Sequence, residues 1–298
     1  MASKNTFFPK FLDAIKEWGT LVISIITFAW SCIQKKGNEI DLNSWLIWGG
    51  VAILLITIVS IWNNWPKKKC SSDFFPGSGN TRIKIIIQKG SVLKQKGIKV
   101  IYVQDTFETS IKKCEEESLL HAFLSLSEVN KHDLDISIEA SLKSNGYTSS
   151  VIPYPLSNQL NAANMKTLKY EIGAVAEYKK DYLLVAFSNI KDDEGHVKEK
   201  NYDQYIDSVN KVFSCLKKDH KGSAVNQTYN VGVWGFQYNG GLYDPHKKIV
   251  TMVRSFIKIS QQKPFCETLR ICVNGKHAER IDFKKMQVLL DYIVDTTE

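Results

Sequence analysis

Hydrophobic residues are distributed unevenly along the chain. No charged residue occurs from Trp18 to Gln34 or from Leu42 to Pro66, and both stretches are apolar on every face that a helix would present. Beyond residue 80 the pattern changes to short runs typical of β-strands, which alternate with segments of helical periodicity. The pattern therefore predicts two parts: an apolar helical region at the N-terminus and an α/β domain after it.

The two uncharged stretches predict transmembrane helices at about residues 18–34 and 44–65. At ~1.5 Å per residue the first stretch reaches only ~25 Å, slightly less than the ~30 Å hydrocarbon core of a bilayer, and flanking lysines would close the gap by snorkelling. Tryptophans at both ends of the second stretch match the aromatic belts of membrane proteins. A helical hairpin buried in a soluble core is the alternative, whereas acidic residues ahead of the first stretch argue against a cleaved signal peptide.

Lysines set the expected orientation of this hairpin. Three lysines precede the first stretch and three follow the second at 67–69, whereas the loop between the stretches contains only those at 35–36. Because positively charged flanks stay in the cytoplasm, both termini are expected there. Residues 1–69 are therefore expected to be a multi-pass region of the cell inner membrane, in contact with the lipid bilayer.

A Ser-, Gly- and Pro-rich segment at 70–80 predicts a linker, and residues 81–298 then form the expected α/β domain. Because strand and helix patterns alternate in mixed order, the predicted fold is a central mixed sheet flanked by helices. Strands are expected at 83–88, 98–103, 167–178, 182–188, 229–234 and 268–273, and helices at 117–126, 134–144, 202–216, 247–259 and 283–294.

The formal net charge of +8 is concentrated near the N-terminus, where residues 1–69 carry half of it. The other half is spread over the α/β domain as a mildly basic surface, which argues against nucleic acid as a partner. The six cysteines include no C-x-x-C pair and no Cys/His cluster with zinc spacing. Neither a metal nor another cofactor is therefore expected.

Three turns qualify as ligand-binding segments. In α/β sheets ligands bind at the carboxyl ends of strands, where turns bring backbone amides close to phosphates. The turns at 88–92, 104–109 and 234–241 each follow an expected strand, although none contains a Walker A or dinucleotide-binding fingerprint. Ser188 and Asn189, at the end of the 182–188 strand, either contact the ligand or only cap a turn. The residues predicted to bind ligand are Gly90, Ser91, Val92, Asp105, Thr106, Phe107, Ser188, Asn189, Trp234, Gly235, Phe236, Gln237, Tyr238 and Asn239.

Catalytic side chains do not form a recognisable set. A hydrolase needs a positioned base and an activated water. Asp105, Glu108 and His121 are candidate bases, but they have no characteristic spacing, and no Ser/His/Asp or Cys/His order stands out. The sequence therefore predicts a binding protein without catalytic residues.

Four segments in chain order resemble the macro-like domain of membrane-anchored effectors of bacterial Thoeris anti-phage defence. They are IKIIIQKGSVLKQKGIKVIYVQDTFET, VIPYPLSNQL, YEIGAVAEYKKDYLLVAFSNI and VGVWGFQYNGG, and the resemblance runs over about residues 83–273. The preceding pair of apolar stretches belongs to the same architecture.

This resemblance implies a receptor for an ADP-ribose-derived signal, such as a histidine-ADP-ribose conjugate, made by a TIR-domain protein. It also implies that the effector then disrupts the membrane to abort infection, and that it assembles as a homo-oligomer. A membrane-tethered ADP-ribose hydrolase and a non-binding membrane scaffold are the alternatives.

The chain departs from the usual macro pattern in three places. Ser91 stands where macro domains usually have an aspartate, so the base contact differs. Bulky side chains at 236–238 interrupt a loop that is usually rich in small residues, and they are able to stack on a base or an imidazole. The motif at 161–164, Asn-Ala-Ala-Asn, follows a Pro/Ser/Asn-rich loop rather than the second strand, so we interpret it as a coincidence.

Gly235 provides a direct test of the third turn. We expect Gly235→Glu to abolish nucleotide binding while the domain stays folded, because the new side chain adds volume and negative charge where backbone must approach phosphates. Titration of the purified variant with nucleotide measures this, and unchanged binding would show that the turn is not the phosphate site.

Overall fold

The computed structural model describes residues 57, 68–77, 81–110, 118–194, 196, 198, 200–219, 227–234, 244–261 and 263–297. The chain divides into two compact units, Met1–Lys67 and Lys68–Glu298. All described residues except Thr57 lie in the second unit, and the fold below is that of this unit.

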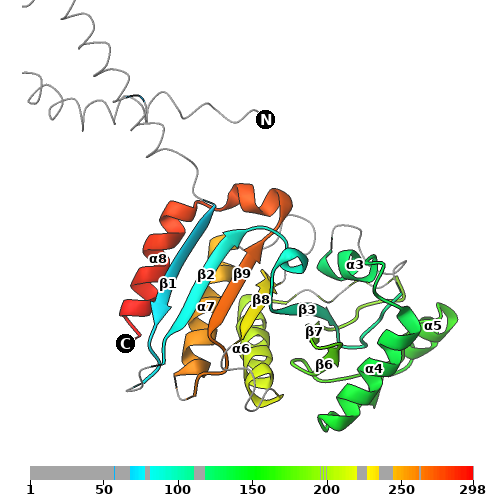
Figure 1. Ribbon diagram of the computed structural model, residues 1–298. Helices are drawn as coiled ribbons and strands as arrows, with labels where there is room; N and C mark the ends of the chain where they lie inside the picture. Colours follow the sequence, from blue (N-terminus) through cyan, green and yellow to red (C-terminus); the bar gives the residue numbers. More distant parts are fainter. Residues whose placement is uncertain are drawn as a thin grey trace, which may run out of the picture. The chain divides into compact units, whose positions relative to one another are not determined.

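Within the described residues, seven strands form one mixed sheet in the order β1-β2-β9-β8-β3-β7-β6 (Figure 1). These strands are β1 (Lys69–Phe74), β2 (Ile83–Lys89), β3 (Ile98–Gln104), β6 (Val175–Tyr178), β7 (Tyr182–Ser188), β8 (Thr228–Gly232) and β9 (Thr268–Val273). The five central strands, β2, β9, β8, β3 and β7, are parallel to one another. At the two edges of the sheet, β1 pairs with β2 and β6 pairs with β7 in antiparallel orientation. A separate pair, β4 (Ser150–Val151) and β5 (Leu168–Lys169), is antiparallel.

Helices cover both faces of the sheet and create two cores. The α-helices are α3 (Leu119–Leu124), α4 (Lys131–Ser144), α5 (Leu156–Ala162), α6 (Tyr202–Asp219), α7 (Pro245–Ser260) and α8 (Phe283–Asp295), and two 3-10 helices are η1 (Val92–Lys94) and η3 (Gly275–Arg280). One core joins the sheet to α6, α7 and α8, and the other joins it to α3 and α4. In Figure 1, α6 and α7 lie behind β8 and β9. The predicted mixed sheet flanked by helices is therefore confirmed.

Strand β7 shows why helices cover both faces of the sheet. Successive side chains of a strand point to opposite faces. Leu183, Val185 and Phe187 belong to the core under α6 and α7, whereas Leu184 and Ala186 belong to the core under α3 and α4. An uninterrupted apolar run is what a parallel strand buried on both faces requires.

The described helices contradict the predicted fold class in its N-terminal part and the predicted location. No helix in the described part of the chain is long and apolar enough to cross a membrane. The 18-residue α6, for example, has Asp203, Asp207 and Lys211 on successive turns, as expected for a helix with one wet face. The predicted spans at 18–34 and 44–65 lie outside the described residues, apart from Thr57. The predictions of a two-span hairpin and of a multi-pass inner-membrane location are therefore wrong. The predicted contact with the lipid bilayer depended on them.

The structure also corrects the segment expected to be a linker. Residues 69–74 form strand β1, which pairs with β2 in antiparallel register. Cys70 and Phe74 are buried, and the backbone N–H and C=O of Ser71 are bonded to the side-chain amide of Gln287 in α8 at 3.1 and 3.0 Å. Only Cys70 and Phe74 of this edge strand are buried, so it needs few apolar residues and its composition resembled that of a loop.

Two glycines with left-handed backbone provide a matched test of packing. Gly97, in the turn before β3, has a φ of +101°, and a Cβ there would lie 2.6 Å from the carbonyl oxygen of Thr228. Gly146, after α4, has a φ of +76°, and a Cβ there would meet nothing within 4 Å. We expect Gly146→Ala to lower the free energy of unfolding by about 1–2 kcal/mol, the cost of a left-handed L-residue, and Gly97→Ala to lower it further. Urea denaturation measures both losses, and equal losses would contradict the close approach at Gly97.

Candidate functional site

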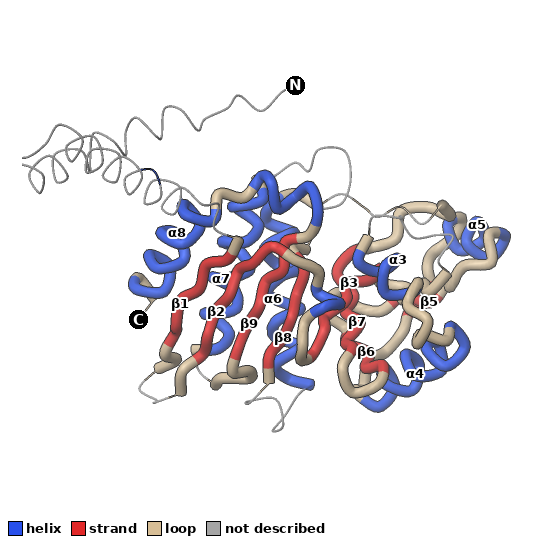
Figure 2. Tube along the Cα trace, turned by 45° about the horizontal axis from the view of Figure 1, so that its top comes forward, coloured by secondary structure: helices blue, strands red, loops and turns tan. Residues whose placement is uncertain are grey.

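The carboxyl ends of the parallel strands define the edge of the sheet at which ligands bind in α/β folds. Figure 2 shows β2, β9 and β8 side by side in the sheet. Each of the three turns predicted to bind ligand follows one of the parallel strands, namely β2, β3 and β8, and Ser188 ends β7. The fold therefore brings the predicted segments to one edge of the sheet, although their residues lie far apart in sequence.

The first turn is anchored to the end of β9. The backbone N–H of Gly90 donates to the carbonyl of Val273 at 2.9 Å. Ser91 precedes η1, and its carbonyl accepts a hydrogen bond from the Gln95 side chain at 3.2 Å. Val92 is buried, and a Cβ at Gly232 in β8 would lie 3.8 Å from its Cγ2. The first turn thus lies against the end of β8.

The second turn is joined to the turn after β7 by the carboxylate of Asp105. This carboxylate is buried and accepts hydrogen bonds from Nδ2 of Asn189 and from the backbone N–H of Ile190, both at 2.9 Å. The backbone N–H of Asp105 donates to the carbonyl of Ser188 at 2.7 Å. Asp105, Ser188 and Asn189, all predicted from sequence, are therefore brought together, and the Asn189 amide and the Asp105 carboxylate bond each other.

Both acidic candidate bases accept hydrogen bonds from backbone amides. Besides Asp105, the buried Glu108 accepts from the N–H of Ser110 at 2.8 Å and from that of Lys166 at 3.0 Å. His121, the third candidate, lies in α3 and is half-buried. The two carboxylates therefore shape the turn after β3.

Two predicted site residues contain a buried polar atom that has no hydrogen-bond partner among the described residues. They are Oγ1 of Thr106 and Nε1 of Trp234, in side chains that are each 1% exposed. Trp234 packs on Phe187 and Phe213 with ring centroids 5.7 and 4.9 Å apart. A buried polar atom left unsatisfied costs about 1–3 kcal/mol, so these atoms at the ends of the adjacent strands β3 and β8 have unused capacity to bond a polar group.

The remaining residues of the third turn lie outside the described residues. Their predicted contacts with ligand stay predictions. They are Gly235, Phe236, Gln237, Tyr238 and Asn239.

A half-buried lysine, Lys200, and a buried lysine, Lys248, lie near the same edge. Lys200 Nζ donates to the carbonyl of Phe187 and, at 2.6 Å, to Oγ of Ser208, and lies 4.7 Å from the centroid of the Phe187 ring. Burial lowers the pKa of Lys200 to about 8, although the charge of Asp105 acts to raise it. Lys248, in the first turn of α7, is 3% exposed, and burial lowers its pKa as well. Positive charge at this edge favours an anionic ligand.

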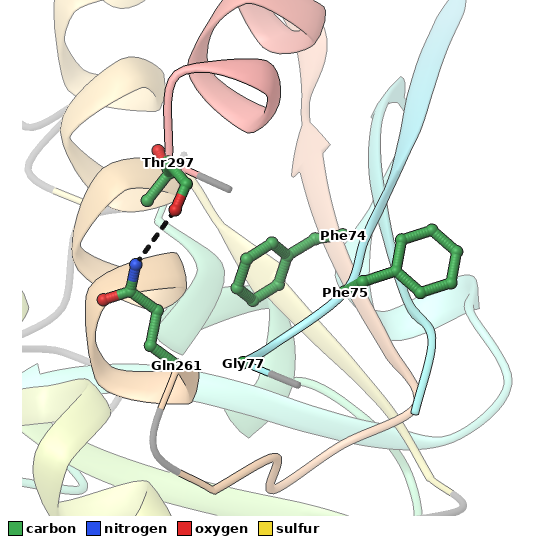
Figure 3. Close-up of a pocket in the computed structure, with 5 residues that line it drawn as sticks. All are labelled: Phe74, Phe75, Gly77, Gln261 and Thr297. Atoms are coloured by element: carbon green, nitrogen blue, oxygen red, sulfur yellow. Dashed lines mark hydrogen bonds between the residues drawn. The ribbon is translucent and has the colours of Figure 1, made fainter. Parts of the chain in front are cut away.

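A cavity of about 340 Å³ lies at the opposite edge of the sheet (Figure 3). This edge is identified by Phe74, which pairs with Ile83 at the start of β2. The cavity contains none of the residues predicted to bind ligand, and it is lined by Phe74, Phe75, Gly77, Gln261 and Thr297. In the described part of the chain, no three His, Cys, Asp or Glu side chains form a group that could hold a metal.

Comparison with known proteins assigns the family. Residues 85–274 match the macro domain of Thoeris protein ThsA. This chain belongs to that family. The resemblance inferred from sequence is confirmed for the macro domain of the ThsA family, and the match runs from within β2 to the end of β9.

Solved macrodomain structures are also similar to this ThsA macro domain. The Oceanobacillus iheyensis macrodomain with ADP shares 11% sequence identity at a TM-score of 0.47, covering 77% of this chain and 100% of that chain. The same macrodomain with MES bound gives 11% identity and a TM-score of 0.47, covering 76% and 99%. No curated protein matches the chain.

Neither Lys200 nor Lys248 of this macro domain was predicted from sequence to lie at the site. Lys200 follows Lys198 and an acidic residue, and such a charged run is typical of a solvated loop. Lys248 lies in α7, and the apolar periodicity of this helix predicted that other residues, not this lysine, face the core. No local signal distinguishes either lysine, because the burial arises from packing against β7 and α6.

The lowered pKa of Lys200 predicts a specific pH dependence of stability. Between pH 8 and the ordinary lysine pKa of 10.5, the unfolded chain binds a proton that the folded chain has lost, so the free energy of unfolding rises with pH across this window. Lys200→Met removes this contribution. We therefore expect the wild type to become more stable relative to Lys200→Met as pH increases. Urea denaturation of both proteins at several pH values measures their free energies of unfolding.

Lys198→Met is the matched control, because this lysine is exposed and lies two residues away. It should keep the pH profile of the wild type. Parallel profiles for wild type and Lys200→Met would contradict a buried ammonium group at Phe187.

Proposed function

We propose that this macro domain is a receptor that binds an ADP-ribose-type nucleotide at the carboxyl edge of its sheet. Membership of the ThsA macro-domain family supports the ligand class. The observation that carries the assignment to this edge is a pair of buried atoms without a hydrogen-bond partner in the described part of the chain, Oγ1 of Thr106 and Nε1 of Trp234, at the ends of neighbouring strands. A ligand with oxygen acceptors and hydroxyl groups would satisfy both.

Charge supports a diphosphate at the same edge. Lys200 Nζ bonds the carbonyl of Phe187 near the end of β7, just before α6 begins, and Lys248 lies in the first turn of α7. Helix N-termini favour anions because their free N–H groups point outward. A diphosphate placed here would gain from the helix ends and from both lysines.

The state of the carboxylates supports binding without turnover. A general base must be able to reach a water molecule or a substrate proton. Asp105 and Glu108 already accept hydrogen bonds from the backbone amides of Ile190, Ser110 and Lys166, and they hold the turns in place. The role proposed for them is to shape the receptor site.

In the cell, the proposed ligand is a signal made by a TIR-domain protein during infection, such as a histidine-ADP-ribose conjugate. The bulky residues at 236–238 are expected to stack on its base or imidazole. Binding would shift the receptor toward a responding state, which we propose to be a homo-oligomer, by as much as the ligand prefers that state.

The wild-type chain should bind ADP-ribose without converting it. Calorimetry with ADP-ribose, its histidine conjugate and AMP, followed by product analysis, tests this directly. AMP should bind at least about tenfold more weakly, equivalent to ~1.4 kcal/mol, because it lacks the second phosphate and ribose. Product formation would indicate a hydrolase, and absence of heat with every nucleotide would refute the proposal.

Thr106→Val sharpens the test because stability and affinity should change in different directions. Valine has nearly the same shape but removes a buried hydroxyl that has no hydrogen-bond partner among the residues described, so the free energy of unfolding should stay constant or increase. Affinity for ADP-ribose should fall by about fivefold or more, equivalent to ~1 kcal/mol, the typical value of one hydrogen bond.

Ser260→Ala is the matched control for Thr106→Val. Oγ of Ser260 is likewise buried without a partner among the described residues, but Ser260 ends α7 at the opposite edge of the sheet. This variant should bind ADP-ribose as the wild type does. Equal affinity losses in both variants would place the effect outside the proposed site.

A further inference from the structure

The turn after β3 has an unusual conformation for its sequence. Residues 105–109 are all at most 5% exposed. Phe107 within this turn has a φ of +51°, in the left-handed region that a bulky residue rarely occupies. Its ring packs edge-to-face on Tyr170 at 5.6 Å. Such a strained backbone persists only where its surroundings hold it.

The group that holds this backbone is Lys166, which comes from the segment between α5 and β5. Its Nζ donates to the carbonyl of Phe107 at 2.9 Å and to Oδ1 of Asp135 in α4 at 2.6 Å. Its backbone N–H donates to the Glu108 carboxylate at 3.0 Å. Thr109 donates to the same Asp135 oxygen at 2.8 Å. Lys166 therefore joins the carbonyl of the left-handed residue, and the side chain of the residue after it, to Asp135 in α4.

We propose that Lys166 is a positioning residue for the nucleotide site. By fixing the carbonyl of Phe107 it sets the backbone on either side, so that Thr106 keeps its place at the end of β3 and Asp105 reaches the turn after β7. This inference rests on the proposed function, because Lys166 acts through Thr106 and Asp105 rather than by touching the nucleotide.

The partial exposure of this ion pair indicates a local rather than a global role. The side chains of Lys166 and Asp135 are 28% and 27% exposed. Partly exposed ion pairs add little to overall stability, whereas a hydrogen bond to a strained carbonyl determines which conformation the turn populates. If Lys166 is lost, the fraction of molecules with the competent turn falls, and the apparent dissociation constant rises in proportion.

The decisive comparison is Lys166→Met against Lys99→Met. Lys99 lies on the same strand that leads into the turn, but near its other end, where it pairs with Asp181 at 3.8 Å and lies 4.9 Å from the Tyr182 ring centroid. Each variant loses one lysine from an ion pair. We expect Lys166→Met to weaken ADP-ribose binding by about tenfold and Lys99→Met to bind as the wild type. Equal affinities for the two variants would overturn the proposal.

Hydrogen exchange provides a readout that needs no ligand. The N–H of Phe107 donates to the Gln104 carbonyl and that of Ile190 to the Asp105 carboxylate, so amides at 104–110 and 188–190 report on the two turns. They should exchange faster in Lys166→Met than in Lys99→Met, while amides of β2 and β9 stay protected. Unchanged exchange at both turns would refute the positioning role, whatever the wild type binds.

These two measurements separate the inference from the proposed function. If wild type fails to bind ADP-ribose while exchange at the two turns still depends on Lys166, the ligand assignment is wrong and the positioning of the turns stands. If Lys166→Met does not fold, Lys166→Arg is the second variant, since arginine keeps the charge and a donor but changes the geometry. It should show intermediate affinity and intermediate exchange, and wild-type values for both would overturn the proposal.

Discussion

Two turns from different strands share one buried carboxylate, that of Asp105, and the carboxyl edge is arranged around it. The carboxylate bonds Asn189 and Ile190, while the Asp105 carbonyl accepts from the N–H of Tyr170 at 2.8 Å. Three segments distant in sequence are thereby fixed to the end of β3. A buried charge is tolerated only when its hydrogen bonds are made, so this carboxylate makes the conformation of each turn depend on the others.

Near this carboxylate, the charged group of Lys200 lies next to aromatic rings. The Lys200 ammonium lies over Phe187, and Phe187 also packs on Tyr205 and Trp234 at 5.9 and 5.7 Å. Rings of this kind stabilise a cation while excluding water. The anion site that we propose at this edge would therefore rest on a layer of side chains beneath it.

How far the sequence predicts this protein depends on whether a feature is set locally. The apolar run of β7 and the position of turns after strands follow from periodicity, so the sheet and the meeting of Asp105 with Ser188 were foreseeable. Strand β1 was missed because an edge strand needs few apolar residues, and the N-terminal hairpin was wrongly assigned to the fold class. The burial of Lys200 and the left-handed backbone of Phe107 depend on contacts made across the fold by residues such as Lys166, and no local pattern signals them.

The order of strands has a consequence for how the chain folds during synthesis. Strand β2 pairs with β9, which at residues 268–273 follows every other described strand of the sheet in sequence. Strands β3, β7 and β6 are neighbours within residues 98–188 and so are able to assemble much earlier. Pairings between distant segments form slowly because a long loop must close first. The sheet is thus completed when β8 and β9 insert between β2 and β3, so its carboxyl edge forms only after the residues up to 273 have left the ribosome.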